Sequence, residues 1–159
     1  MAERPALSLS DPAHLLSTWF GCGLLPKAPG TWGSLAALPC GALIAWLGGP
    51  WLLLAAALLA LGLGLWASAR TAEALGSHDP GAVVIDEVVG QWLALLPVSQ
   101  AYLYYLPAFV AFRAFDILKP WPVSWADRKL PGAWGIMMDD VIAGLYAAAV
   151  VYGLLWLIG

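Results

Sequence analysis

The distribution of charged residues along the chain constrains its fold more than any other feature. No Asp, Glu, Lys or Arg occurs in residues 28–69, 88–112 or 141–159. The charged residues gather instead in three patches, at 3–27, 70–87 and 113–140. Crossing the hydrocarbon core of a bilayer takes about 20 predominantly apolar residues in helical form. The pattern therefore predicts a chain that enters a membrane several times.

The composition supports this interpretation and excludes a nucleic-acid partner. Hydrophobic residues make up 62% of the chain and charged residues 11%, against about 45–50% and about 25% in soluble domains. A chain of 159 residues has too much surface to bury this excess in a core. The net charge of −3 also lacks the basic excess of nucleic-acid-binding domains. Nothing in the sequence indicates an obligatory protein partner.

The first 25 residues and the cysteines carry three smaller expectations. Glu3 and Arg4 are followed by prolines and no apolar core, so this segment is not expected to be a signal peptide. Residues 11–20 are expected to form a short interfacial helix capped by Ser10. Cys22 and Cys40 lack a metal-ligand spacing and are expected to be free packing residues.

Turn-forming residues divide the apolar stretches into helices. Residues 31–47 and 51–69 are expected to form an antiparallel pair, broken at Gly48-Gly49-Pro50. Residues 88–112 are either one helix or a hairpin that turns near Pro97, and the hairpin is favoured because it lets the charged patches meet. A loop over 121–138 is expected before the last helix, 141–158. Its small residues favour close packing in lipid: Ala143, Gly144, Ala147 and Ala148.

These elements predict an all-α fold, a polytopic membrane helical bundle formed by a single domain over residues 1–159. About five membrane-inserted helices and one short N-terminal interfacial helix are expected.

Five acids stand next to the predicted membrane segments. Asp86 and Glu87 open one apolar helix, Asp139 and Asp140 open another, and Asp116 lies near the end of a third. Helix starts favour carboxylates, which is an alternative explanation for the two pairs but not for Asp116. Acids beside membrane segments are costly unless they are paired or bind metal. Gathered on one side, they would form an oxygen-rich site that suits Mg²⁺ or Mn²⁺ rather than zinc.

Basic and hydroxyl residues occur at matching places. Lys27 precedes a Pro29-Gly30 turn, and Thr31 and Ser34 follow in the first turn of a predicted helix. This is either a generic anion site or an ordinary capped turn.

Arg113 and Lys119 flank Asp116 at steps of three residues. They are either its salt-bridge partners or phosphate ligands, and the planar fork of Arg113 is the better phosphate candidate.

A loop histidine provides a possible proton-transfer group. His78 and Asp79 lie in a Gly-Ser-His-Asp-Pro-Gly segment. They are either a general acid–base pair or a solvated histidine beside a turn. His14 is expected to be structural, and Asp127-Arg128 is expected to be a local ion pair, with a substrate contact as the second interpretation.

Four sequence blocks together resemble a known family. The blocks PKAPGTWGSL at 26–35, VIDEVVG at 84–90, FRAFDILKPWP at 112–122 and GIMMDDVIAG at 135–144 are similar to the signature of bacterial phosphatidylglycerophosphatase A. They occur in the family's order, and the resemblance runs from about Asp11 to the last helix. One block alone would be a weak signal, but four in order are specific.

The resemblance implies an Mg²⁺-dependent enzyme of the bacterial inner membrane. Its substrate would be a phospholipid that stays in the bilayer, phosphatidylglycerophosphate, cleaved to phosphatidylglycerol and inorganic phosphate. The blocks carry over seven candidate site residues: Asp86, Glu87, Arg113, Asp116, Lys119, Asp139 and Asp140. The Lys and Arg distribution favours a cytoplasmic position for the site of this multi-pass protein.

The residues fit a mechanism in which one or two Mg²⁺ ions join the five acids to a phosphomonoester. Arg113, Lys119 and Lys27 with the Thr31 turn would hold the remaining phosphate oxygens. A covalent aspartyl-phosphate on one of the acids is left open.

Three other functions are weighed against this one. A small cation transporter needs acids distributed through the membrane depth, whereas these gather at helix ends. A phosphotransferase that joins lipid precursors would use a similar metal site and would need an alcohol acceptor. A structural subunit would bind the divalent ion without turning over any lipid phosphate.

Overall fold

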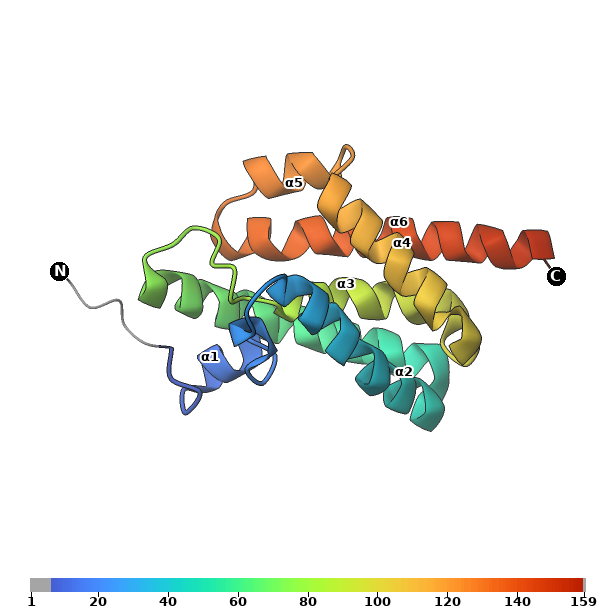
Figure 1. The fold of residues 1–159 in the computed structure, drawn as a ribbon, viewed down its shortest axis with the longest axis horizontal. Helices are drawn as coiled ribbons and strands as arrows, with labels where there is room; N and C mark the ends of the chain where they lie inside the picture. Colours follow the sequence, from blue (N-terminus) through green and yellow to red (C-terminus); the bar gives the residue numbers. More distant parts are fainter. Residues whose placement is uncertain (1–6, 159) are drawn as a thin grey trace.

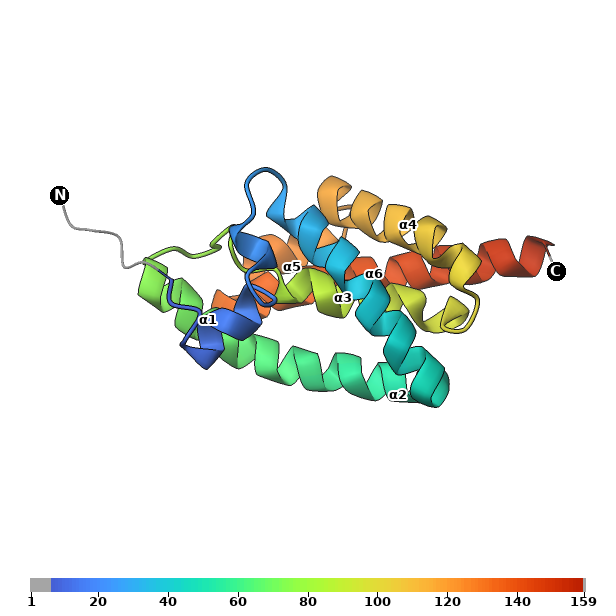
Figure 2. The same ribbon diagram turned by 60° about the horizontal axis from the view of Figure 1, so that its bottom comes forward.

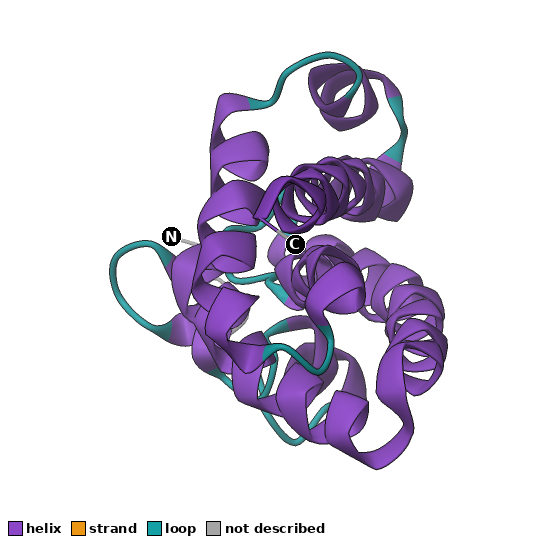
Figure 3. Cartoon of the chain, turned by 90° about the vertical axis from the view of Figure 1, so that its right-hand side faces the viewer, coloured by secondary structure: helices purple, strands orange, loops and turns teal. Residues whose placement is uncertain are grey.

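The computed structural model describes residues 7–158. The expectation about a signal peptide at Glu3 and Arg4 lies outside these residues. Within the described part the chain forms helices joined by turns and loops, with no strand (Figure 3). The all-α prediction is confirmed.

The N-terminal helix is shorter than expected. α1 (Pro12–Ser17) is capped by Asp11 rather than Ser10, since the Asp11 carboxylate accepts a hydrogen bond from the Ala13 N–H at 2.8 Å. The predicted end at residue 20 is wrong because Trp19 and Phe20 both adopt positive φ angles. A 3₁₀ turn, η1 (Cys22–Leu24), follows. Cys22 and Cys40 are free, as expected.

The predicted helix pair forms α2 (Pro29–Leu75), which is sharply broken at a glycine pair. Gly48 and Gly49 leave the helical conformation, and the φ of 65° at Gly49 is one that glycine adopts readily. Figure 2 shows the chain reversing direction at this break, with the two arms diverging from it. The first arm begins two residues earlier than predicted, and the second continues past Ala69.

The ambiguous stretch is a hairpin. α3 (Ile85–Leu95) is followed by two 3₁₀ turns, η2 (Leu96–Val98) and η3 (Tyr102–Tyr104), and then by α4 (Tyr105–Leu118). The favoured interpretation is therefore confirmed. With 11 and 14 residues, α3 and α4 are roughly 16 Å and 21 Å long, less than the bilayer core of about 30 Å.

The predicted loop over 121–138 is wrong. It contains α5 (Val123–Lys129) and the first turns of α6 (Gly132–Ile158). Pro122 and Gly132 stand at helix starts, where proline and glycine do not interrupt a helix. Asp139 and Asp140 consequently lie inside α6 rather than at its N-terminus, so the preference of helix starts for carboxylates cannot explain this pair.

The contact between α3 and α6 positions the acids. Figure 1 shows the two helices side by side and running in the same direction. A Cβ atom added to Gly144 would lie 2.4 Å from the Gly90 carbonyl oxygen, so the contact requires glycine. Asp86 precedes Gly90 by one turn, and Asp140 precedes Gly144 by one turn. Because the helices run in parallel, this contact brings Asp86 and Asp140 face to face.

The predicted small-residue face of the last helix is confirmed by its burial. Ala143, Gly144 and Ala147 are buried, whereas Ala148, the fourth predicted member, is only half-buried.

The outer surface fits a membrane protein. Many large apolar side chains are exposed, among them Leu103 at 85%, Trp51 at 79% and Trp156 at 77%. α2 and α6 are long and apolar enough to cross a bilayer. The full count of about five inserted helices remains a prediction.

Candidate metal and phosphate site

A polar cavity of about 290 Å³ lies where α3 begins. Residues from the second and third charged patches meet there, on or beside four helices, whereas no residue of the first patch lines the cavity. All five predicted acids line it, together with Arg113, Lys119 and Asp79. The remaining lining is formed by Ala28, Pro29, Gly30, Pro80, Gly81, Val83, Ile117 and Ile136.

Three of the acids form a compact cluster, which we call the acid trio: Asp86, Glu87 and Asp140. One carboxylate oxygen from each lies within 4.8 Å of the others. Each of the three also has a buried oxygen with no hydrogen-bond partner in residues 7–158. Burying such groups without compensation is costly. An all-oxygen set of this kind fits Mg²⁺ or Mn²⁺ by donor chemistry.

Arg113, which is on α4, lies beside the acid trio. It forms an ion pair with Asp116, and its Nη1 lies 3.8 Å from Glu87 Oε1. The Arg113 Nε is buried and has no partner among the described residues. Arg113 thus offsets the charges of Asp116 and Glu87, and its Nε–H donor remains unpaired among the described residues.

The first turn of α2 lies directly against these charges. A Cβ atom at Gly30 would stand 2.1 Å from Glu87 Oε1 and 3.2 Å from Arg113 Nη1, so a larger residue would displace the Glu87 carboxylate. First-turn N–H groups of a helix have no partner within the helix and favour anions. The backbone at Gly30 therefore brings an anion-binding helix start to the cavity wall.

Lys119 and Asp139 form the other charged contact of the cavity. Lys119 Nζ donates to Asp139 Oδ2 and to Asp127 Oδ1, both at 2.8 Å. Partial burial lowers the pKa of Lys119, but these two hydrogen bonds outweigh it and raise the pKa above its ordinary value. The other oxygen of Asp139 accepts from the Asp140 backbone N–H at 2.9 Å. Asp139 is thus fully engaged by protein groups, unlike its neighbour Asp140.

The side chains of the predicted anion turn do not line the cavity. Ser34 is buried and donates its hydroxyl proton to the Gly30 carbonyl oxygen at 2.9 Å. Lys27 is exposed, and its carbonyl oxygen accepts from Trp32 Nε1 at 3.2 Å. Thr31 is absent from the lining as well. Of this turn, only Ala28, Pro29 and Gly30 line the cavity.

The remaining predicted residues lie in the loop before α3 and in the third charged patch. Asp79 lines the cavity, whereas His78 is exposed and lies outside the lining. The expected Asp127–Arg128 ion pair is wrong: Asp127 pairs with Lys119, and Arg128 Nε donates to the Ser124 carbonyl oxygen. A substrate contact was the second interpretation of Asp127 from the sequence, and its pairing with Lys119 was not predicted, since the only signal was a second acid within ten residues of Lys119.

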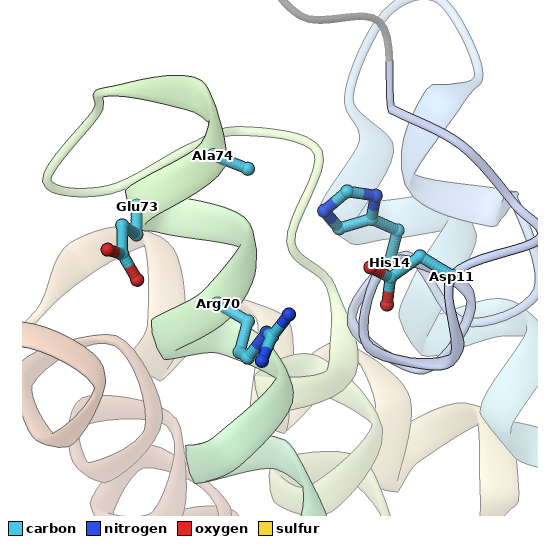
Figure 4. A pocket seen from close by; sticks show the side chains of 5 residues that line it. All are labelled: Asp11, His14, Arg70, Glu73 and Ala74. Atoms are coloured by element: carbon cyan, nitrogen blue, oxygen red, sulfur yellow. The ribbon is translucent and has the colours of Figure 1, made fainter.

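A second polar cavity, of about 500 Å³, lies between α1 and the end of α2. Its lining mixes both signs of charge: Asp11, His14, Arg70, Glu73 and Ala74. Figure 4 shows the Arg70 guanidinium directed toward α1 and the Glu73 carboxylate pointing away from it. His14 accepts a backbone hydrogen bond from Ser8, which fits the structural role expected for it. The acid trio belongs to the first cavity, which is therefore the candidate site.

Comparisons with known proteins show which proteins this chain is similar to. A phosphatidylglycerophosphatase A from Escherichia coli is 41% identical, covering 94% of this chain and 87% of the relative. A phosphatidylglycerophosphatase A from Haemophilus influenzae is 43% identical, covering 93% and 91%. A putative phosphatidylinositol-3-phosphatase from Bacteroides thetaiotaomicron is 39% identical, covering 91% and 94%.

No solved structure matches the chain. The family model of phosphatidylglycerophosphatase A matches residues 15–155, a range that includes every residue of the candidate site. The chain therefore belongs to the phosphatidylglycerophosphatase A family.

Proposed function

We propose that this protein is a phosphatase that hydrolyses phosphatidylglycerophosphate to phosphatidylglycerol and inorganic phosphate, with Mg²⁺ or Mn²⁺ as its cofactor. Membership of the family supports the reaction. The observation that carries the chemistry is the acid trio, whose buried oxygens lack protein partners in the described chain and lie beside Arg113. Anion-binding and cation-binding groups thus share one cavity, as a metal-assisted phosphatase requires.

The acid trio is the proposed holder of the divalent ion. Asp116 and Asp139 belonged to the predicted ligand set, but each already contacts a basic side chain, Arg113 and Lys119 respectively. We therefore assign these two acids to the positioning of the bases. Mg²⁺ bound at the trio would supply neutralisation of phosphoryl oxygens and a more acidic bound water.

The basic groups are the proposed phosphate holders. Arg113 offers its free N–H and a planar fork that suits phosphate oxygens. The Gly30 N–H and the Lys119 ammonium approach the same cavity from α2 and α4. Because positioning and electrostatics supply most of the catalysis in phosphoryl transfer, these fixed donors are the main contribution of the chain.

Asp79 is the proposed proton-transfer group. It is the exposed carboxylate in the lining and stands on the loop that precedes α3. A group in this position is accessible to water and to the leaving alcohol. His78, its predicted partner, is not required by this arrangement because it does not line the cavity.

The proposed location is the bacterial inner membrane, with the site on the cytoplasmic side of a multi-pass chain. The arms of α2, the α3–α4 hairpin and α6 would supply about five inserted segments, with α1 at the interface. The short α3 is buried by its neighbours, which makes a partial crossing acceptable because protein surrounds it. The acyl chains would stay in the bilayer while the head group enters the cavity.

The test is phosphate release from defined lipids by the purified full-length protein in detergent micelles. Phosphatidylglycerophosphate, phosphatidylinositol 3-phosphate and phosphatidic acid would be compared with Mg²⁺, with Mn²⁺ and with EDTA. We expect metal-dependent release that is fastest from phosphatidylglycerophosphate and needs no alcohol acceptor.

Each alternative outcome points to another function. Faster release from phosphatidylinositol 3-phosphate would shift the substrate toward the one named for the Bacteroides relative. Turnover only with an added alcohol would indicate a phosphotransferase, and metal binding without turnover a structural subunit.

A further inference from the structure

Asp127 touches the site from outside the cavity. It does not line the cavity, yet its carboxylate accepts a hydrogen bond from Lys119, which does. We propose that Asp127 is a positioning residue that acts through Lys119 on the phosphate group of the substrate. This inference rests on the proposed phosphatase function and adds a residue to it.

The geometry leaves one direction open for the Lys119 ammonium. An ammonium group has three N–H donors. Asp127 and Asp139 each accept one of them, both at 2.8 Å. The third donor remains for a phosphate oxygen in the cavity. Two fixed acceptors thus orient the one donor that the substrate would use.

Asp127 is itself held in place by the packing of α5 on α6. Figure 1 shows α5 beside the first turns of α6. Val123 and Ala126 on α5 are fully buried. A Cβ atom at Gly135 would lie 2.5 Å from the Leu130 carbonyl oxygen, so the end of α5 lies directly on the α6 backbone. The short α5 therefore presents Asp127 from a rigid surface.

Without Asp127, Lys119 would be restrained by Asp139 alone. A lysine side chain has many accessible rotamers, so a single ion pair at a partly exposed position leaves it mobile. Asp139 also contacts the Asp140 backbone. A freed ammonium would then be able to move toward the acid trio and compete with the divalent ion. Asp127 holds the ammonium on the α5 side of the cavity.

The test is a double-mutant cycle on the purified full-length protein, with phosphatidylglycerophosphate as substrate. Asp127→Asn should lower kcat/KM about 10- to 100-fold, as removal of an outer partner typically does. It should also weaken inhibition by inorganic phosphate. In a Lys119→Met background, Asp127→Asn should change kcat/KM by less than about 2-fold, because the two residues act as one unit.

Arg128→Gln is the matched control on the same helix. Arg128 is exposed, and its side chain makes one hydrogen bond to a described residue, to the Ser124 carbonyl oxygen, and no ion pair with one. The kcat/KM of the Arg128→Gln protein should stay within about 2-fold of the wild-type value. If Asp127→Asn lowers the melting temperature, Asp127→Glu is measured in its place. Asp127→Glu keeps the negative charge and moves the carboxylate by one methylene. A changed phosphate inhibition constant with an unchanged melting temperature would support the inference, and unchanged kinetics would overturn it.

Three further results would overturn the inference, and they differ in what else they affect. Additive losses in the cycle, or a fully active Lys119→Met protein, would remove the role of Asp127 while leaving the phosphatase function intact. A wild-type protein that releases no phosphate from any lipid monoester would overturn both.

Discussion

The two sides of one cavity differ in how their carboxylates are compensated. On the α3 side, Asp86 and Asp140 converge with Glu87, and the nearest basic atom is Arg113 Nη1, 3.8 Å from Glu87. On the α4 side, Asp116 and Asp139 each contact a basic side chain directly. The difference shows that acids adjacent in the sequence have different partners: one group keeps unpaired oxygens and is the proposed cation site, and the other holds basic side chains of the described chain.

Asp139 and Asp140 show this division most sharply. Successive residues of an α-helix point about 100° apart. Asp139 therefore faces Lys119, while Asp140 faces the start of α3. Asp139 and Asp140 are adjacent in the sequence but face different sides of the cavity. They therefore form a matched pair for substitution.

Removal of the divalent ion should have the largest effect, because the α3 side has no other compensating charge of its own. We expect EDTA to abolish phosphate release and to lower the melting temperature. Mg²⁺ at 100 times its Kd stabilises a one-site protein by about 2.7 kcal/mol. A thermal-shift titration with Mg²⁺ measures this stabilisation. Full activity in EDTA would show that the acids on the α3 side need no divalent ion for catalysis.

Asp140→Asn should be nearly as severe as metal removal. Charge stabilisation by a bound metal is worth several kcal/mol, so kcat should fall about 1000-fold. The melting temperature without metal should stay the same or rise, because the variant removes a buried charge that has no partner. Phosphate-release kinetics and thermal unfolding measure the two effects. Activity close to wild type would place the metal elsewhere.

Arg113→Lys should have an intermediate effect, since it tests the side of the cavity where acids and bases are paired. The charge is kept, but the planar fork that contacts Asp116 and Glu87 is lost. Loss of a preorganised donor of this kind should lower kcat/KM about 100-fold with little change in Mg²⁺ affinity. Steady-state kinetics at a series of Mg²⁺ concentrations separates the effect on kcat/KM from the effect on Mg²⁺ affinity. A parallel loss of Mg²⁺ affinity would show that the two sides are not independent.

His78→Asn should have the smallest effect. His78 is exposed and outside the cavity lining, and substitutions at such positions usually change stability by less than about 0.5 kcal/mol. We expect kcat/KM within about 2-fold of wild type across the pH range of activity. A loss of 10-fold or more would instead support the general acid–base pair that the sequence allows.

Much of the fold was predictable because local signals and packing agree. Gly48 and Gly49 break α2 where the sequence indicates, and the turn near Pro97 divides α3 from α4. The segment over 121–138 was not predictable in the same way. Prolines and glycines occur in loops as well as at helix starts and close helix contacts, and here Pro122 precedes a helix and Gly135 permits the close contact between α5 and α6.

The candidate site was predictable as a set of residues but not in its internal arrangement. Seven of the eight charged residues of the four sequence blocks line one cavity, and the exception is Lys27. Which acids remain unpaired depends on the tertiary position of α5 and on the glycine contact between α3 and α6, and neither can be read from spacing. Ser34 was assigned as a donor to phosphate, but its hydroxyl proton is taken by the Gly30 carbonyl oxygen one turn earlier.

Direct measurement of Mn²⁺ binding by electron paramagnetic resonance would test the role of the acid trio without relying on turnover. The full-length protein would be titrated as wild type, Asp140→Asn and Asp139→Asn. We predict that Asp140→Asn weakens Mn²⁺ binding by more than about 100-fold, whereas Asp139→Asn, a change to an outer contact, weakens it by no more than about 10-fold. Equal affinities in the two variants, or a larger loss in Asp139→Asn, would contradict the assignment of the divalent ion to Asp86, Glu87 and Asp140.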